Sequence, residues 1–175
     1  MVRLFSGRFD RQAQTWTEET SRTVRPKAVA RVPLSTDVPE AYAADYREAC
    51  NVLVDSPKAS AALSRRCLQH LLREKAQVKP SDLYNEIQEL LDRGSLPSHI
   101  ADSVDAVRNI GNFASHPIKS RASGEIVPVE PGEAEWNLDV LESLFDFYFV
   151  GPARTQARKD ALNKKLADAG KPTLK

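Results

Sequence analysis

The chain has 175 residues, 41% of them hydrophobic and 28% charged, which is typical of a folded protein. Its two cysteines lie too far apart for a zinc ribbon, which favours a reducing, cytoplasmic compartment. We expect no metal and no cofactor. No uncharged stretch approaches the roughly 18 apolar residues of a membrane span, which excludes membrane insertion. The net charge of +1 divides into +3 over residues 1–38, −7 over 39–150 and +5 over 151–175, so nucleic acid could contact only a local basic patch or the ends.

Residues 1–38 form the first of three predicted regions. Their hydrophobic residues follow no helical period, and prolines interrupt them. We expect an extended N-terminal arm, with at most a short strand. A helical domain should follow over residues 39–150, and a basic helical tail over 151–175.

Residues 39–150 show apolar residues at three- and four-residue steps, which predicts helices. Ser56 and Pro57 are typical of a helix start, and Gly94 is typical of a left-handed helix stop. The tail has almost no apolar face, so its helix should project into solvent. The expected helices cover about residues 39–54, 57–76, 80–94, 96–116, 133–150 and 154–169.

Residues 117–132 contain three prolines and two glycines and predict a structured loop or hairpin, with Glu125–Val129 as a candidate short strand. No series of alternating strands appears elsewhere, and the connections are short. We therefore predict an all-α fold: a bundle of four to five helices, with an extended N-terminal arm and a short loop or β-hairpin before the last core helix.

The predicted helix over residues 96–116 carries an uncommon set of polar residues. At 100° per residue they share about 120° of arc, opposite an apolar stripe. Such a row offers a cation, two amides and an imidazole to one ligand. It contains Asp105, Arg108, Asn109, Asn112, Ser115 and His116.

Two interpretations of this row stay open. In the first interpretation the row is an ordinary solvated face, and its asparagines form hydrogen bonds with backbone carbonyls freed where the helix bends at Gly111. In the other it binds a ligand, because it lacks the Lys/Glu ladder of a soluble helix and two Asn and one Gly weaken the helix by about 1–2 kcal/mol. Arg65 and Arg66 could add a basic edge that receives RNA, although pairing with Glu48 or Glu74 is the simpler expectation.

The chain resembles a bacterial family, the domain of unknown function 4145. The resemblance covers roughly residues 39–150, and its most specific part is the block Arg-Asn-Ile-Gly-Asn-Phe-Ala-Ser-His over residues 108–116. That family is similar to the HEPN (higher eukaryotes and prokaryotes nucleotide-binding) superfamily of helical bundles. HEPN proteins are often metal-independent endoribonucleases of bacterial toxin and phage-defence systems.

The resemblance implies roles for individual residues. His116 would act as general acid or base, Arg108 would stabilise the transition-state charge, and Asn109 would orient the phosphate. Asn112, Ser115, Arg65 and Arg66 would contact the substrate. Because one histidine per chain is too few for both the acid and the base, a homodimer is implied.

Two functions therefore remain. The first is an RNA- or nucleotide-binding protein of HEPN type, acting as a metal-independent endoribonuclease. The second is a non-catalytic helical dimerisation or adaptor module of a restriction or phage-defence system. HEPN nucleases usually have a shorter spacer than the seven residues between Arg108 and His116, which favours the second function. The concentration of Arg, Asn and His in one row favours the first.

Overall fold

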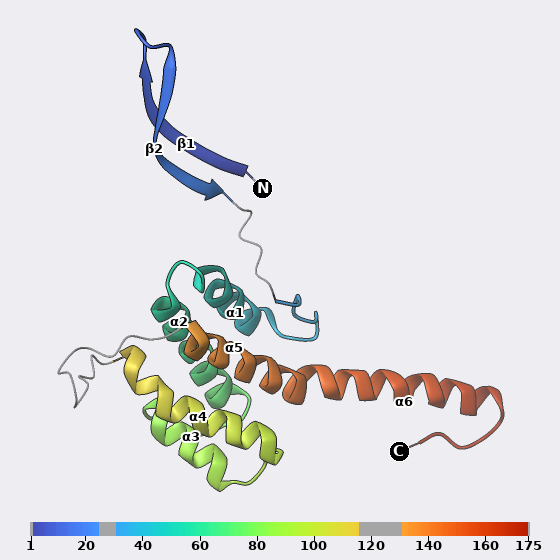
Figure 1. Ribbon diagram of the computed structural model, residues 1–175. Helices are drawn as coiled ribbons and strands as arrows, with labels where there is room; N and C mark the ends of the chain where they lie inside the picture. Colours follow the sequence, from blue (N-terminus) through green and yellow to red (C-terminus); the bar gives the residue numbers. More distant parts are fainter. Residues whose placement is uncertain (1, 25–30, 116–130, 175) are drawn as a thin grey trace. The chain divides into compact units, whose positions relative to one another are not determined.

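The computed structural model describes residues 2–24, 31–115 and 131–174. The chain divides into two compact units, Met1–Arg31 and Val32–Lys175, and each is described by itself. The first unit is a β-hairpin and the second is a helical bundle (Figure 1). The predicted loop over residues 117–132, with its candidate strand Glu125–Val129, lies almost wholly outside the described residues.

The hairpin consists of antiparallel strands β1 (Val2–Asp10) and β2 (Thr15–Val24). The carboxylate of Asp10 accepts hydrogen bonds from the backbone N–H groups of Gln12 (2.8 Å) and Ala13 (3.1 Å), which closes the turn and lowers the pKa of Asp10. Gln14 completes the turn with a positive φ of 54°. Phe9 and Trp16 are opposite each other in the register, with ring centroids 6.0 Å apart.

This hairpin corrects the expectation of an extended arm with at most a short strand. The prolines that argued against strands lie at position 26 and beyond, so none interrupts the two strands. Four threonines and a terminal valine make β2 a favourable strand sequence. A shift in register between Ser6 and Gly7 leaves one extra residue on β2, as in a β-bulge.

The bundle begins with α1 (Glu40–Val52) and α2 (Pro57–Glu74), which pack against each other. Ser56 caps α2 as predicted: its hydroxyl oxygen accepts a hydrogen bond from the N–H of Ala59 at 3.2 Å. Pro57 occupies the first turn, where its missing N–H has no cost. The two cysteines, Cys50 and Cys67, are buried free thiols.

Helices α3 (Leu83–Asp92) and α4 (Ser98–Ser115) form a second packed pair. Asp82 caps α3 by accepting from the N–H of Asn85 at 2.9 Å, so the helix begins three residues later than predicted. Gly94 has a φ of +60°, which confirms the predicted left-handed stop.

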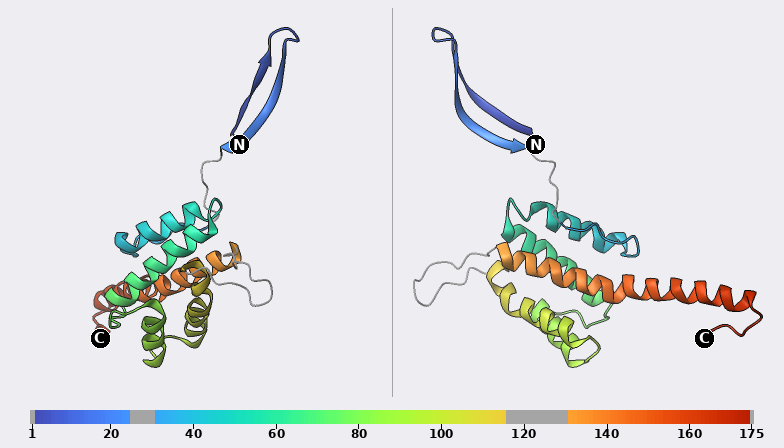
Figure 2. Two further views of the ribbon diagram at one scale, coloured as in Figure 1. Left: turned by 90° about the vertical axis from the view of Figure 1, so that its left-hand side faces the viewer. Right: turned by 45° about the vertical axis from the view of Figure 1, so that its right-hand side comes forward.

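The last helices form one continuous rod (Figures 1 and 2). Helix α5 (Pro131–Phe145) passes through a π-helical turn, η1 (Asp146–Val150), into α6 (Gly151–Asp168). At Gly151 a Cβ atom would lie 2.9 Å from the carbonyl oxygen of Asp146, so glycine fits the close approach of the backbone there. The prediction that α6 projects into solvent is confirmed, since none of its residues is buried.

Helix α2 is the centre of the bundle, because it contacts α1, α3, α4 and α5. Its buried serines and alanine, Ser60, Ala61 and Ser64, leave room for close helix approach. Large apolar side chains from α2 to α5 fill the remaining interior, and burial of each stabilises the fold by about 2 kcal/mol. The largest are Phe145, Leu71, Leu72, Ile87, Leu90, Leu138, Leu141 and Leu144.

A buried ion pair joins α2 to α3. The Glu86 side chain is fully buried, and its Oε1 accepts from Arg73 Nε at 2.7 Å and from the backbone N–H of Ser81 at 2.8 Å. Arg73 also donates to the carbonyl of Ser81 at 2.9 Å. This network holds the connection between the two helices.

Replacing Arg73 by methionine should leave the Glu86 carboxylate buried without its cation. We expect a loss in unfolding free energy of about 3 kcal/mol, at the low end for buried pairs because Arg73 is 36% exposed. Urea denaturation measures this loss. The double variant Arg73→Met/Glu86→Leu should recover part of it, and a double variant no more stable than the single one would contradict the assignment.

Candidate functional site

The described part of the polar row on α4 has the predicted orientation. Val104 and Val107 are fully buried, whereas the Asp105 and Arg108 side chains are 41% and 17% exposed. The apolar and polar faces of the helix are therefore separated as the sequence indicated.

The other members of the row are only partly described. Asn109, Asn112 and Ser115 are positions of α4, but their side chains lie outside the described part of the molecule, as does the whole of His116. Their predicted roles stay predictions.

Arg108 is held by α3 and by its own helix. Its guanidinium forms an ion pair with Asp105 at 2.5 Å, donates a hydrogen bond to Gln88 Oε1, and lies over the Tyr84 ring at 4.9 Å from the centroid. Tyr84 and Gln88 are one turn apart on α3 and present an aromatic face and an amide together. Arg108 thereby fastens α3 to α4.

Arg65 reaches α4 from α2 and has a different environment. It is half-buried, and its Nη1 donates to the backbone carbonyl of Val107, one residue before Arg108, at a long 3.4 Å. Among the described residues no carboxylate pairs with it. Burial lowers the pKa of Arg65, the direction expected for a cation moved out of water without a counter-ion.

Arg66, the next residue, contacts α1 instead. It forms an ion pair with Asp45 at 2.5 Å while 63% of its side chain is exposed, and this pairing raises its pKa. The expected partners were Glu48 and Glu74. The carboxylate that pairs with Arg66 belongs instead to Asp45, which lies about one turn before Glu48 on α1. The two adjacent arginines thus differ. Arg66 is exposed and paired with a carboxylate, whereas Arg65 is half-buried and has no carboxylate partner among the described residues.

Comparison with known proteins identifies the family. A family model described as domain of unknown function (DUF4145) matches residues 47–166. The chain belongs to the DUF4145 family. No curated protein and no solved structure shows significant similarity to it. The DUF4145 match contains α2 to α5, both arginines of interest and most of α6, so it extends beyond residue 150, where the resemblance was expected to end.

Tyr84 and Gln88 were not among the predicted site residues of this DUF4145 chain. Their spacing of four residues on a predicted helix was visible, but only the packing of α3 on α4 identifies Arg108 as their partner. Asn137 on α5 was missed as well. It is buried, and no described group forms a hydrogen bond with either atom of its amide.

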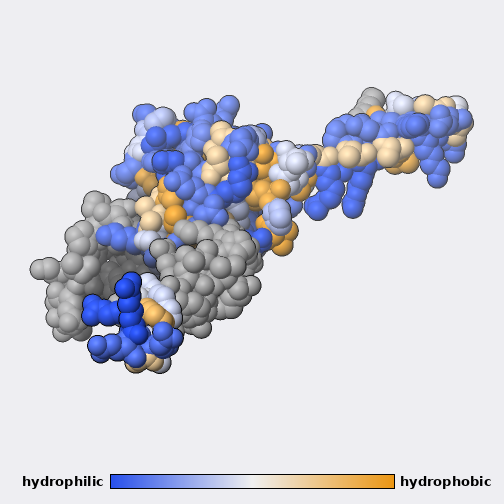
Figure 3. All heavy atoms as spheres, turned by 90° about the horizontal axis from the view of Figure 1, so that it is seen from above, coloured by the Kyte–Doolittle hydropathy of each residue, from blue (hydrophilic) through white to orange (hydrophobic). Residues whose placement is uncertain are grey.

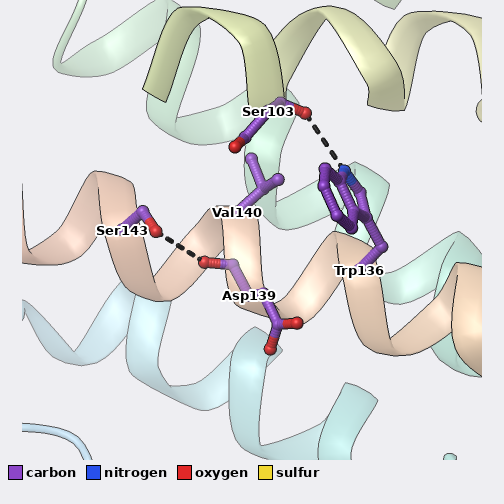
Figure 4. Close-up of a pocket in the computed structure, with 5 residues that line it drawn as sticks. All are labelled: Ser103, Trp136, Asp139, Val140 and Ser143. Atoms are coloured by element: carbon purple, nitrogen blue, oxygen red, sulfur yellow. Dashed lines mark hydrogen bonds between the residues drawn. The ribbon is translucent and has the colours of Figure 1, made fainter. Parts of the chain in front are cut away.

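A small pocket of about 100 Å³ lies between α4 and α5 (Figure 4). The Trp136 indole faces α4 and donates to the carbonyl of Ser103 at 3.1 Å. Asp139 and Ser143 complete the lining together with Val140. The Asp139 carboxylate makes this pocket unfavourable for a phosphate.

The other histidines have ordinary environments. The His70 ring packs against Tyr42 with centroids 4.8 Å apart, and His99 is exposed in the first turn of α4. Within the described ranges, no group of three or more His, Cys, Asp and Glu could hold a metal ion. None of the described helices is long and apolar enough to cross a bilayer.

The replacement Arg108→Met should remove an ion pair, an amide contact and a cation–π contact together. We expect the free energy of unfolding to fall by about 1–3 kcal/mol. Urea denaturation provides the measurement, and Arg47→Met, which breaks the exposed pair with Glu40, is the matched control with little expected effect. Wild-type stability in Arg108→Met would show that this guanidinium does not fasten the helices.

Proposed function

We propose that this domain binds RNA or a nucleotide through a phosphate group, with Arg65 as the contact. The observation that carries the proposal is the half-buried guanidinium of Arg65, which has a single long bond to a carbonyl and no described carboxylate partner. A cation that has lost part of its hydration gains most from an anion that arrives with its own hydrogen-bond acceptors.

Several features favour phosphate as that anion. A guanidinium binds two phosphate oxygens at once, in a geometry that its planar fork matches. Residues 39–150 carry a net charge of −7, so a polyanion needs a local cation to approach this surface at all. The resemblance adds Asn109 and Asn112, two positions of α4, as proposed neutral donors for the same ligand.

The resemblance to HEPN proteins supports RNA as the ligand and extends the proposal to metal-independent cleavage. In that extension His116 of one protomer removes the proton of the ribose 2′-hydroxyl, whose oxygen attacks the adjacent phosphorus to form a 2′,3′-cyclic phosphate while the bond to the 5′-oxygen breaks. The second His116 of the dimer gives a proton to the leaving 5′-oxygen, and Arg108 stabilises the negative charge on the phosphate oxygens. A homodimer would bring two such rows to one cleft. The cytoplasm of a bacterium with a defence or toxin system is the expected setting.

A second function is favoured by the contacts of Arg108. Its guanidinium is already engaged by Asp105, Gln88 and Tyr84 of its own chain, as in an arginine whose role is structural. This favours the non-catalytic dimerisation or adaptor module, in which the polar row on α4 contacts a partner protein.

The adjacent arginines offer a matched test of phosphate binding. Arg65→Gln should weaken binding of a fluorescent single-stranded RNA by about tenfold or more, because one charge-assisted contact is lost. Arg66→Gln removes the same charge from the next residue and should change affinity little. Fluorescence anisotropy over a salt series gives both affinities. The slope of log affinity against log salt concentration should become shallower by about one in Arg65→Gln only.

Thermal melts of both variants check that they fold. Equal weakening by the two variants would mean that only overall charge matters, and an unchanged affinity in Arg65→Gln would refute the phosphate site.

Cleavage is tested separately from binding. If the extension holds, RNA is cut in the presence of EDTA, and His116→Ala loses the activity while still binding RNA. Gel analysis of labelled RNAs of varied sequence measures the products. Binding without cleavage by the wild type would leave the domain as a binding module and reject the nuclease.

A further inference from the structure

Helix α6 is an exposed element of the bundle unit. Its sequence contains five basic and two acidic residues, none of its residues is buried, and the only described element in contact with it is the π-helical turn η1. Figure 3 shows it as an arm whose visible surface is mostly hydrophilic. Because no other described element packs on α6, its surface is available to a partner.

Three of the basic residues form a row along the helix. Arg154, Arg158 and Lys165 fall within about 40° of arc and extend over roughly 16 Å of the helix axis. All three are exposed, and none forms an ion pair with a described residue. Asp160 lies on the far side of the helix, and Asp168 lies one turn beyond Lys165, about 60° from the row.

The base of α6 is fixed, so the row has a defined direction. Within η1, the Phe149 ring packs against Tyr42 and Phe145 of the core, with centroids 5.5 and 6.4 Å away. Lys75 of the α2–α3 connection covers the Phe149 ring at 5.3 Å. The three charges are therefore carried on a helix that is anchored in the bundle at one end.

The composition of α6 fits a polyanion better than a protein. A helix that docks on a protein needs aromatic or other apolar anchors, and α6 has no aromatic residue and only two leucines, Leu162 and Leu166. Successive cations on one face match the successive phosphates of a nucleic-acid backbone, where each contact releases counter-ions.

We infer that α6 is a second nucleic-acid contact, an arm that follows the phosphates of a single RNA strand through Arg154, Arg158 and Lys165. The inference rests on the proposed function for the identity of the ligand. It adds a length requirement: a nucleotide or a very short RNA occupies the Arg65 site alone, whereas a longer strand also gains the contacts to α6.

The test compares two triple variants of the full chain that lose the same charge. Row variant Arg154→Gln/Arg158→Gln/Lys165→Gln should weaken binding of an RNA of about 20 nucleotides and lower the salt slope by about two. Control variant Lys159→Gln/Lys164→Gln/Lys171→Gln should lower both quantities much less. A 5′-phosphorylated dinucleotide should bind all three proteins equally.

The outcomes separate this inference from the proposed function. If Arg65→Gln still weakens RNA binding but the two triple variants behave alike, the row on α6 is rejected and the phosphate site stands. If the row variant weakens binding and Arg65→Gln does not, the phosphate site is rejected and the arm stands.

Two further results would overturn the inference. One is a wild-type chain that binds no RNA at low salt, which rejects both proposals. The other is a row variant with unchanged RNA affinity and an altered sedimentation coefficient, which would make the row a contact between protein chains. Because none of α6 is buried, the row variant should fold, and a thermal melt confirms this.

Discussion

The burial of helix α2 against four other helices is the constraint on which the bundle depends. A helix in that position must satisfy polar side chains on every side, and most of them are satisfied. Ser64 donates to carbonyls of its own helix, Arg66 pairs with Asp45, and Arg73 pairs with Glu86. Arg65 differs, because its described contact is one long bond to a carbonyl of α4. Because Arg66 and Arg73 on the same helix each pair with a carboxylate, this difference is what suggests a ligand at Arg65.

Arg65 of α2 contacts α4 and Arg108 is part of α4, but the two residues have different roles. Arg108 connects α3 to α4 through three contacts, which fixes the backbone of α4 at the point where Arg65 touches it. In the proposed function, Arg108 therefore supports the phosphate site by holding α4 in place rather than by touching the ligand.

Local signals predicted the helices well. Ser56 with Pro57, and Gly94, marked helix ends that the structure confirms, because capping depends on neighbouring residues only. The hairpin over residues 2–24 was not predicted, since its evidence is the pairing of two strands whose individual patterns are weak. Two separate helices were expected over residues 133–150 and 154–169. The π-helical turn over Asp146–Val150 instead joins them into one rod, Gly151 and Pro152 lie in the first turn of α6, and the close approach of Gly151 to the Asp146 carbonyl is visible only in the backbone geometry.

The candidate site was less predictable than the fold. The polar arc of α4 followed from the helical period, but the partner of each arginine is set by tertiary packing. Arg65 and Arg66 are identical in type and adjacent in sequence, so nothing local assigns one to α4 and the other to α1. The 100° between neighbouring helix positions separates them, and their opposite pKa shifts follow from that separation.

The acidic body and the two cationic features belong to one electrostatic design. An exposed row such as that of α6 acts at long range and is strongly screened by salt, whereas a half-buried cation such as Arg65 is screened less. An RNA strand would therefore be attracted first to α6, and its contact with Arg65 would be less sensitive to salt. The negative surface over residues 39–150 repels polyanions that reach neither, which favours selective over general binding. The net charge of +1 is the sum of +3 over residues 1–38, −7 over 39–150 and +5 over 151–175, and in the proposed function the last two act in opposite directions on a polyanion.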